Sequence, residues 1–296
     1  MSELAKAFRR EVAAALAHVV GDDARFEPLS GGSVDRAFRV RGSKGSAFVK
    51  TADGPVPDRF AAEAAGLTAI ATSGVTAHGV RVPRVFIARD DPPAFLALED
   101  LGQGRARPDF DEALGRGLAA LHRVTDARGF GFECDTFCGG VRQENGWCSS
   151  WVDFWRERRL IPQLRHARAA GMASADLAAI ERVTMRVERL VGAPEPSALI
   201  HGDLWSGNVL VANDGRPALI DPSASFAHRE AELGMMVLFG GFSERVFASY
   251  RESFPLAPGW RERLPLYSLY HLLNHFHLFG GGYGAQAVAV ARQLCR

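Results

Sequence analysis

The stretch His201-Gly202-Asp203-Leu204-Trp205-Ser206-Gly207-Asn208 decides the fold of this chain, together with Ile220-Asp221-Pro222 a few residues later. Its spacing is that of a kinase catalytic loop, in which an aspartate faces the acceptor hydroxyl while a downstream asparagine and aspartate bind Mg²⁺. Phosphoryl transfer depends mainly on positioning and charge neutralisation, so one rigid loop must hold these oxygen ligands. Asp203 is therefore the candidate catalytic residue, and Asn208 and Asp221 are the candidate metal ligands.

The surroundings of this loop favour the catalytic interpretation over a simpler one. Single Asp and Asn residues often do no more than cap turns. Here the whole spaced set is flanked by short β-like runs at 198–200, 209–211 and 217–220, and Asn213-Asp214-Gly215 marks a tight hairpin turn. The complete pattern is much rarer than any one of its members.

Three upstream features would complete a nucleotide site. Gly31, Gly32 and Ser33 lie between two predicted strands, where glycines let backbone amides approach phosphate oxygens. Lys50 ends the third strand and could reach the phosphates, and Glu63 in the following helix is its natural ion-pair partner. Each feature has a simpler alternative: the glycine segment could be an ordinary hairpin turn, Lys50 could lie at a solvated strand end, and Glu63 could be a surface residue of its helix. The order of the three features along the chain favours the nucleotide site.

The periodicity of apolar residues predicts two lobes. A helix over 5–20, strands over 25–29, 37–41, 47–51, 84–88 and 94–98, and a helix that ends near 71 form the first lobe. The glycine-rich segment 99–104 then separates it from predicted helices over 110–124, 151–170, 175–191, 230–239 and 260–279. We expect an α+β bilobal fold with an antiparallel five-stranded lobe at 1–101 and a mostly helical lobe with the catalytic hairpin at 102–296.

Composition excludes several classes of protein. Among 296 residues, 35 Lys and Arg balance 34 Asp and Glu, so nothing favours a nucleic-acid partner. A 47% hydrophobic and 23% charged composition argues against disorder. The first twenty residues lack the layout of a signal peptide, and the apolar stretch 264–279 is interrupted by histidines. We therefore expect a cytoplasmic protein without a membrane span.

The four cysteines are too sparse for a disulfide scaffold. Cys134, Cys138 and Cys148 fall in one loop-like stretch, and Cys295 lies near the C-terminus. The stretch contains no CxxC pair, and a fourth ligand would have to come from elsewhere, so a structural zinc ion is not expected there.

Several aromatic and basic residues near the loop are further candidates. Trp205, inside the loop, could stack on a sugar or anchor the core. His228 and Arg229 are candidate acceptor contacts, and the alternatives are capping of the next helix or a buried ion pair that braces the loop. We expect Trp147, Trp151 and Trp155 to share one apolar helix face, and His122 to be structural.

With these residues in place, the chain resembles the fructosamine/ketosamine kinase family, relatives of aminoglycoside phosphotransferases with a protein-kinase-like fold. The phrase HGDLWSGN carries most of the resemblance, because the wider phosphotransferase group has HGDxxxxN without Trp-Ser-Gly. Matching segments also occur at 31–38, 130–132, 228–233 and 238–242.

The resemblance implies a kinase that uses ATP and Mg²⁺ to phosphorylate the sugar 3-hydroxyl of ketosamines, either small adducts or glycated protein lysines. The product is labile, so the family is associated with deglycation. By this resemblance Asp203 is the base, Asn208 and Asp221 bind the metal, and Trp205 contacts the sugar. Lys50, held by Glu63, binds phosphate, and Glu99 and Leu101 contact the nucleotide between the lobes.

One departure from the family pattern lies near the expected phosphates. Asp35 stands where asparagine is common, and its charge would repel phosphate if it faced inward. We therefore expect Asp35→Asn to lower the apparent ATP constant.

Two alternative functions stay open. The same catalytic set would serve a phosphotransferase acting on an aminoglycoside or another small alcohol, because the acceptor pocket decides the substrate. The second alternative is a pseudokinase that binds partner proteins, but the intact catalytic set argues against it. We expect a monomer, with a homodimer left open.

Overall fold

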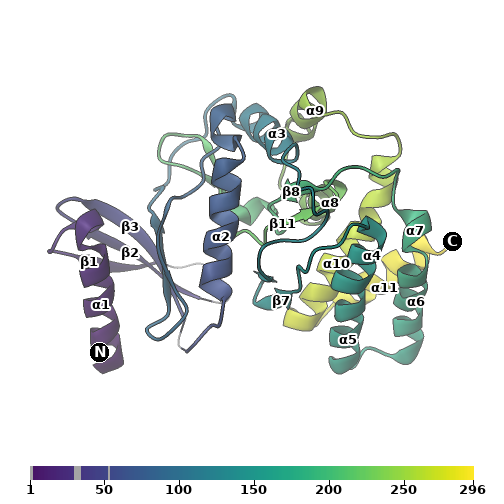
Figure 1. Cartoon of the computed structure of the whole chain (residues 1–296), viewed down its shortest axis with the longest axis horizontal. Helices are drawn as coiled ribbons and strands as arrows, with labels where there is room; N and C mark the ends of the chain where they lie inside the picture. The colour runs from purple at the N-terminus through teal and green to yellow at the C-terminus, as the bar shows by residue number, and fades with distance from the viewer. Residues whose placement is uncertain (1–2, 30–34, 53) are drawn as a thin grey trace.

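The structure is a computed structural model that describes residues 3–29, 35–52 and 54–296 (Figure 1). Its N-terminal part is a five-stranded antiparallel sheet, as predicted, and its strand order is β1-β2-β3-β5-β4. The elements are α1 (Glu3–Val20), β1 (Arg25–Leu29), β2 (Arg36–Gly42), β3 (Gly45–Thr51), α2 (Arg59–Thr72), a 3₁₀ turn (Val75–His78), β4 (Val85–Arg89) and β5 (Phe95–Glu99).

The alternation of side chains along β5 explains how both faces of this sheet are covered. Phe95 and Ala97 are buried in a cluster with Leu16 of α1, whereas Leu96 and Leu98 belong to a cluster with Leu67 of α2. Successive side chains of a strand point to opposite faces, so a continuous apolar run can bury both. Helix α2 stands between the sheet and the C-terminal helices (Figure 1).

The C-terminal part is mostly helical. Its helices are α3 (Phe110–Leu121), α4 (Trp151–Trp155), α5 (Ile161–Ala169), α6 (Ser174–Met185), α7 (Val187–Leu190), α8 (Glu230–Phe239), α9 (Glu244–Ser253), α10 (Trp260–Phe279) and α11 (Tyr283–Leu294). Its strands are β6 (Thr136–Cys138), β7 (Val141–Gln143), β8 (Ala198–Ile200), β9 (Val209–Val211), β10 (Pro217–Leu219) and β11 (Ser225–Ala227). The predicted α+β fold, a five-stranded antiparallel sheet followed by a mostly helical part, is therefore confirmed.

The structure differs from the local predictions in three places. Strand β8 pairs with β11, not with the β9–β10 hairpin. The predicted helix over 151–170 contains a π-helical turn at Arg156–Leu160. Helices α9 and α11, strand β11 and the β6–β7 pair were not predicted. The three-residue strands carry too few residues to show a period.

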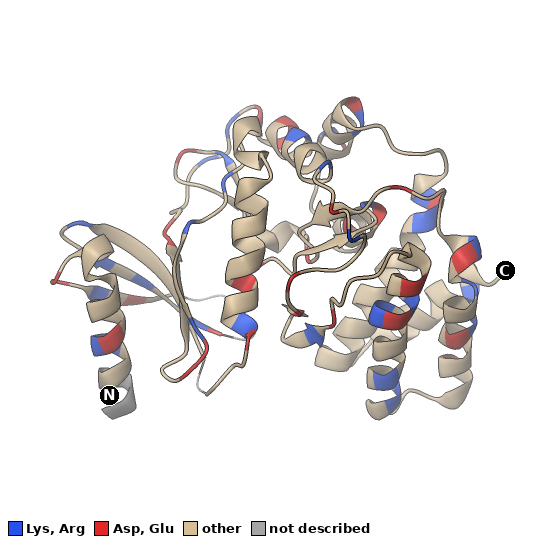
Figure 2. Ribbon diagram, viewed as in Figure 1, with Lys and Arg blue, Asp and Glu red and all other residues tan. Residues whose placement is uncertain are grey.

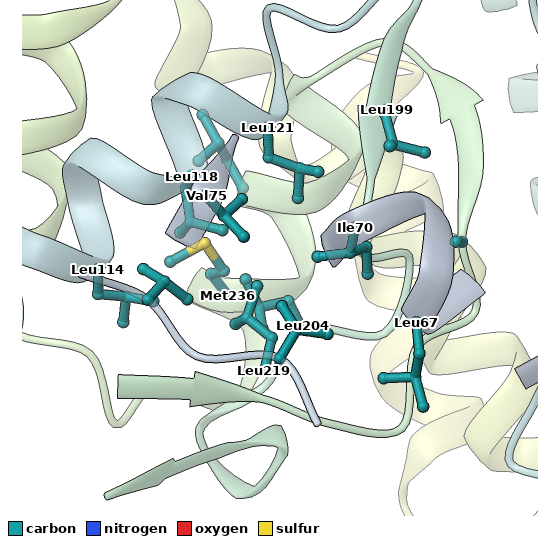
Figure 3. Packing of buried hydrophobic residues seen from close by; sticks show 14 of the residues in the cluster. Leu67, Ile70, Val75, Leu114, Leu118, Leu121, Leu199, Leu204, Leu219 and Met236 are labelled. Atoms are coloured by element: carbon teal, nitrogen blue, oxygen red, sulfur yellow. The ribbon is translucent and has the colours of Figure 1, made fainter. Parts of the chain in front are cut away.

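A hydrophobic core joins the catalytic loop to both parts of the chain. Leu204 of the loop is fully buried, and Figure 3 shows it beside Leu219 and Met236. The same cluster includes Leu67 of α2 and Leu118 of α3, which lie on either side of the predicted boundary at 101/102. That boundary stays a prediction.

Charged residues of both signs are interspersed over the sheet and the C-terminal helices (Figure 2). Within the part of the chain that the structure describes, no helix is both long and apolar enough to span a membrane.

Candidate active site

The catalytic loop follows β8 and is fixed from behind by α8. The backbone amides of His201 and Gly202 donate to the Glu232 carboxylate over 2.5 and 3.1 Å. Gly202 has a φ of 84°, and a Cβ there would collide with the carbonyl oxygen of Ser223. These contacts and the buried Leu204 leave the loop little freedom, so the neighbouring Asp203 is held in place.

Asp203 faces a cavity of about 860 Å³ that is lined by both parts of the chain. Burial raises the pKa of its carboxyl from 3.8 to about 7, although a hydrogen bond from the Cys138 thiol opposes the rise. A carboxylate that exchanges its proton near neutral pH is suited to act as a general base.

Asn208 and Asp221 line the same cavity. The Asn208 Nδ2 donates to the carbonyl oxygen of Asp203 over 2.8 Å, which leaves its Oδ1 as the side-chain acceptor. Asp221 adopts a φ of 54°, unusual for a residue other than glycine, and its side chain is 41% exposed. One amide oxygen and one accessible carboxylate form a donor set that fits Mg²⁺.

Lys50 connects the sheet to this donor set. Its Nζ lies 2.8 Å from Glu63 Oε1 and 2.5 Å from Asp221 Oδ1. Burial alone would lower the pKa of Lys50, but the two carboxylates hold it above its usual value. Burial also raises the pKa of Glu63. The predicted Lys50–Glu63 pair is therefore formed, and Lys50 stays charged.

The other predicted nucleotide and sugar contacts differ in how far the structure describes them. Glu99 and Leu101 line the cavity, and Glu99 pairs with Arg81 at 2.6 Å. Trp205 also lines it and is 42% exposed. The predicted phosphate contacts Gly31, Gly32 and Ser33 lie outside the described residues.

The negative charge of Asp35 is compensated by an ion pair, which its position in the sequence did not indicate. It lies in the cavity, but its Oδ1 is 2.5 Å from Arg59 Nη2, and both side chains are only 15% exposed. The sequence analysis missed Arg59, because nothing in the chain between 35 and 59 links the two residues.

His228 and Arg229 are not among the residues that line the cavity. His228 is 3% exposed and stacks on Tyr267. Arg229 pairs with Glu195 at 2.7 Å and lies over the ring of Phe254. Arg229 therefore forms an ion pair, but with Glu195 and not with the catalytic loop, and the geometry gives no support to acceptor contacts.

Helix α8, which follows Arg229, does hold the catalytic loop, through Glu232, a residue that the sequence analysis overlooked. Glu230 pairs with Arg263 at 2.8 Å, whereas Glu232 accepts the two loop amides described above. A signal was available, since Glu232 is an acidic residue in the first turn of a strongly apolar helix.

The residues expected to be structural are mostly so. His122 is buried, with Nδ1 2.8 Å from the Tyr250 hydroxyl. Trp151 and Trp155 are buried together, but Trp147 precedes α4 and contacts Phe226 instead. The prediction that all three tryptophans share one helix face was therefore wrong for Trp147.

Comparisons with known proteins give the family of this chain. The family model of fructosamine kinase matches residues 8–296. The chain belongs to the fructosamine kinase family. A protein of the ketoamine kinase type from Synechocystis sp. is 38% identical, covering 90% of this chain and 89% of its own. The ketosamine-3-kinase of Mus musculus is 32% identical, covering 90% and 93%. The chain is therefore an enzyme of the kinase type.

Solved structures show the same relationship. A fructosamine-3-kinase-type protein from Thermobifida fusca is 37% identical with a TM-score of 0.85, covering 96% of this chain and 98% of its own. An aminoglycoside phosphotransferase bound to AMP-PNP and hygromycin B has a TM-score of 0.63 at 18% identity, covering 97% and 98%. The second likeness shows the shared fold alone.

Proposed function

We propose that this enzyme transfers the γ-phosphoryl group of ATP to the 3-hydroxyl of the sugar in ketosamines, free or attached to protein lysines. The observation that carries the proposal is the meeting of Asp203, Asn208, Asp221 and Lys50 in one cavity. The ketosamine and ketoamine kinase names of the relatives support the acceptor class.

Asp203 accepts the proton of the acceptor hydroxyl in this scheme. Its pKa of about 7 keeps a large fraction ionised at neutral pH and leaves it basic enough to take a proton as the new bond forms. The loop amides bound to Glu232 fix its position, so little reorganisation is needed during the reaction.

Asn208 and Asp221 would hold Mg²⁺, which supplies charge neutralisation for the phosphates when bound. Lys50 is oriented by Glu63 and carries its charge into the cavity, where it binds phosphate oxygens. Arg59 offers a second cation at the same cavity.

The charges of the cavity favour a ketosamine over a polycationic aminoglycoside. Apart from Asp203, every acidic side chain that lines the cavity, within residues 35–52 and 54–296, already pairs with a basic side chain. These pairs are Asp35–Arg59, Glu63–Lys50, Glu99–Arg81, Asp100–Arg39 and Asp221–Lys50. A polycation would need free carboxylates to pair with it. A sugar can instead stack on the exposed indole of Trp205.

A substrate panel tests the proposal. Purified protein with ATP and Mg²⁺ is given ribulosyl-lysine, fructosyl-lysine, an aminoglycoside or choline, and the product is examined by phosphorus NMR. Phosphate on a ketosamine 3-hydroxyl is the expected result. Turnover of only the aminoglycoside or choline would refute the acceptor class. The cytoplasmic location and the monomeric state remain predictions from the sequence.

A further inference from the structure

A sulfur, a nitrogen and an oxygen ligand meet behind the catalytic residue. Cys138 at the end of β6, His271 in α10 and Asp203 each bring one donor atom to within 4.8 Å of the others. In the part of the chain that the structure describes, no other three side chains of His, Cys, Asp or Glu lie this close. Phosphoryl transfer needs Asp203 but uses neither Cys138 nor His271.

Two of the three groups, Cys138 and His271, are buried. Cys138 is 2% exposed and His271 is 4% exposed. The Nδ1 of His271 has no hydrogen-bond partner, which is costly for a buried polar atom. Burial also lowers the pKa of His271 to about 3, so its ring is neutral, the form that ligates metals.

This donor set selects a different ion from the one that serves catalysis. Thiolate and imidazole ligands suit Zn²⁺, whereas Mg²⁺ takes oxygen ligands. Zinc bonds of about 2.0–2.3 Å place tetrahedral ligands roughly 3.6 Å apart, so donor atoms that already lie within 4.8 Å of one another need to close by at most about 1.2 Å. Three protein ligands would leave a fourth position for water.

We propose that Cys138, Asp203 and His271 form an inhibitory Zn²⁺ site that captures the catalytic carboxylate. The ion enters through the cavity, which Asp203 lines together with Phe137 and Gly139 on either side of Cys138. Binding replaces the thiol proton, which is released to solvent, and the Cys138 sulfur and the Asp203 carboxylate then balance the two charges of Zn²⁺. With its carboxylate bound to zinc, Asp203 cannot accept the proton of the acceptor hydroxyl.

Arg159 limits how tightly the site can bind. This buried guanidinium interacts electrostatically with both Cys138 and His271. Its Nη atoms donate to the carbonyl oxygen of Glu144 and to Asn145 Oδ1, so it has other partners and need not occupy the metal position. Burial and the neighbouring Asp203 carboxylate raise the pKa of the Cys138 thiol, and Arg159 opposes this rise only in part. The charge of Arg159 also repels the ion, and both effects favour a reversible site over a permanent one.

Direct metal binding tests the site without relying on catalysis. The full-length protein, stripped with a chelator, is titrated with Co²⁺ and its thiolate-to-cobalt charge-transfer absorption is recorded, followed by displacement with Zn²⁺. One equivalent should bind. Cys138→Ser keeps a donor for Asp203 but is a poor zinc ligand, and His271→Gln removes the nitrogen. Each should weaken binding at least about tenfold, since even outer-shell partners of metal ligands are worth about 10–100-fold. Cys295→Ser is the matched control and should bind like the wild type.

Inhibition is the second readout, and only this part rests on the proposed function. Zn²⁺ should inhibit turnover of the wild type and of Cys295→Ser, and a zinc-selective chelator should restore it. For each variant, activity is compared with that of the same variant without zinc. Unchanged zinc sensitivity in Cys138→Ser and His271→Gln would place the inhibition at Asn208 and Asp221 and overturn the proposal. So would a cobalt spectrum without thiolate character in the folded wild type, even if the enzyme showed no kinase activity.

Discussion

Replacing Asp203 by asparagine is expected to stabilise the protein while it abolishes activity. Asparagine has nearly the same shape, can still accept the Cys138 hydrogen bond and carries no charge. The wild-type carboxylate is destabilising when ionised, because burial raises its pKa to about 7. The folded state therefore binds more protons than the unfolded state between pH 3.8 and about 7, and its stability falls as the pH rises through this window.

The size of the effect follows from the same values. The difference between 3.8 and about 7 corresponds to about 4 kcal/mol of unfolding free energy above pH 7. At pH 5 only about 2 kcal/mol of this cost is present. The free energy of unfolding of Asp203→Asn should therefore exceed that of the wild type by about 4 kcal/mol at pH 8 and by about half of that at pH 5.

Urea unfolding of the wild type and Asp203→Asn at both pH values, with a chelator and without nucleotide, measures this gain. Glu157→Gln on the exposed side of the π-helical turn is the control and should change little at either pH. If Asp203→Asn is no more stable than the wild type at pH 8, or if its gain does not grow between pH 5 and pH 8, then Asp203 is not a buried carboxyl with a raised pKa.

Three further predictions concern the reaction itself. The kcat/KM should fall as the pH drops below about 7, because Asp203 becomes protonated, and a pH–rate profile with an acid limb near 4 would contradict this. Trp205→Ala should raise KM for the ketosamine by about 2–10-fold, as the loss of one aromatic contact implies, while KM for ATP stays unchanged in steady-state assays. Asp35→Asn should lower the apparent ATP constant by releasing Arg59 to the phosphates, and an increase would show that the pair is needed to shape the cavity.

The catalytic set could be predicted because it is local in the sequence. Asp203 and Asn208 share one loop, and Asp221 follows a hairpin marked by Asp214-Gly215, so their spacing alone indicated their roles. The five-stranded sheet was equally readable from short apolar runs bounded by glycine-rich or polar segments.

Contacts between distant segments could not be predicted in this way. Cys138 lies 65 residues before Asp203, and His271 lies 68 after it, yet their donor atoms meet. Neither residue belongs to a spaced motif, so no pattern indicates that they meet. The partner of β8 was misassigned for a related reason, since both β9 and β11 are three-residue runs and only tertiary packing selects between them.

The most direct test of the account is the position of the phosphate on a ketosamine product. Ribulosyl-lysine and fructosyl-lysine are incubated with ATP, Mg²⁺ and either the wild type or Asp203→Asn, and the products are compared by phosphorus NMR with proton coupling. The account predicts a 3-phosphate from the wild type and none from the variant, at equal and verified folding. A phosphate on another hydroxyl, or undiminished turnover by Asp203→Asn, would contradict it.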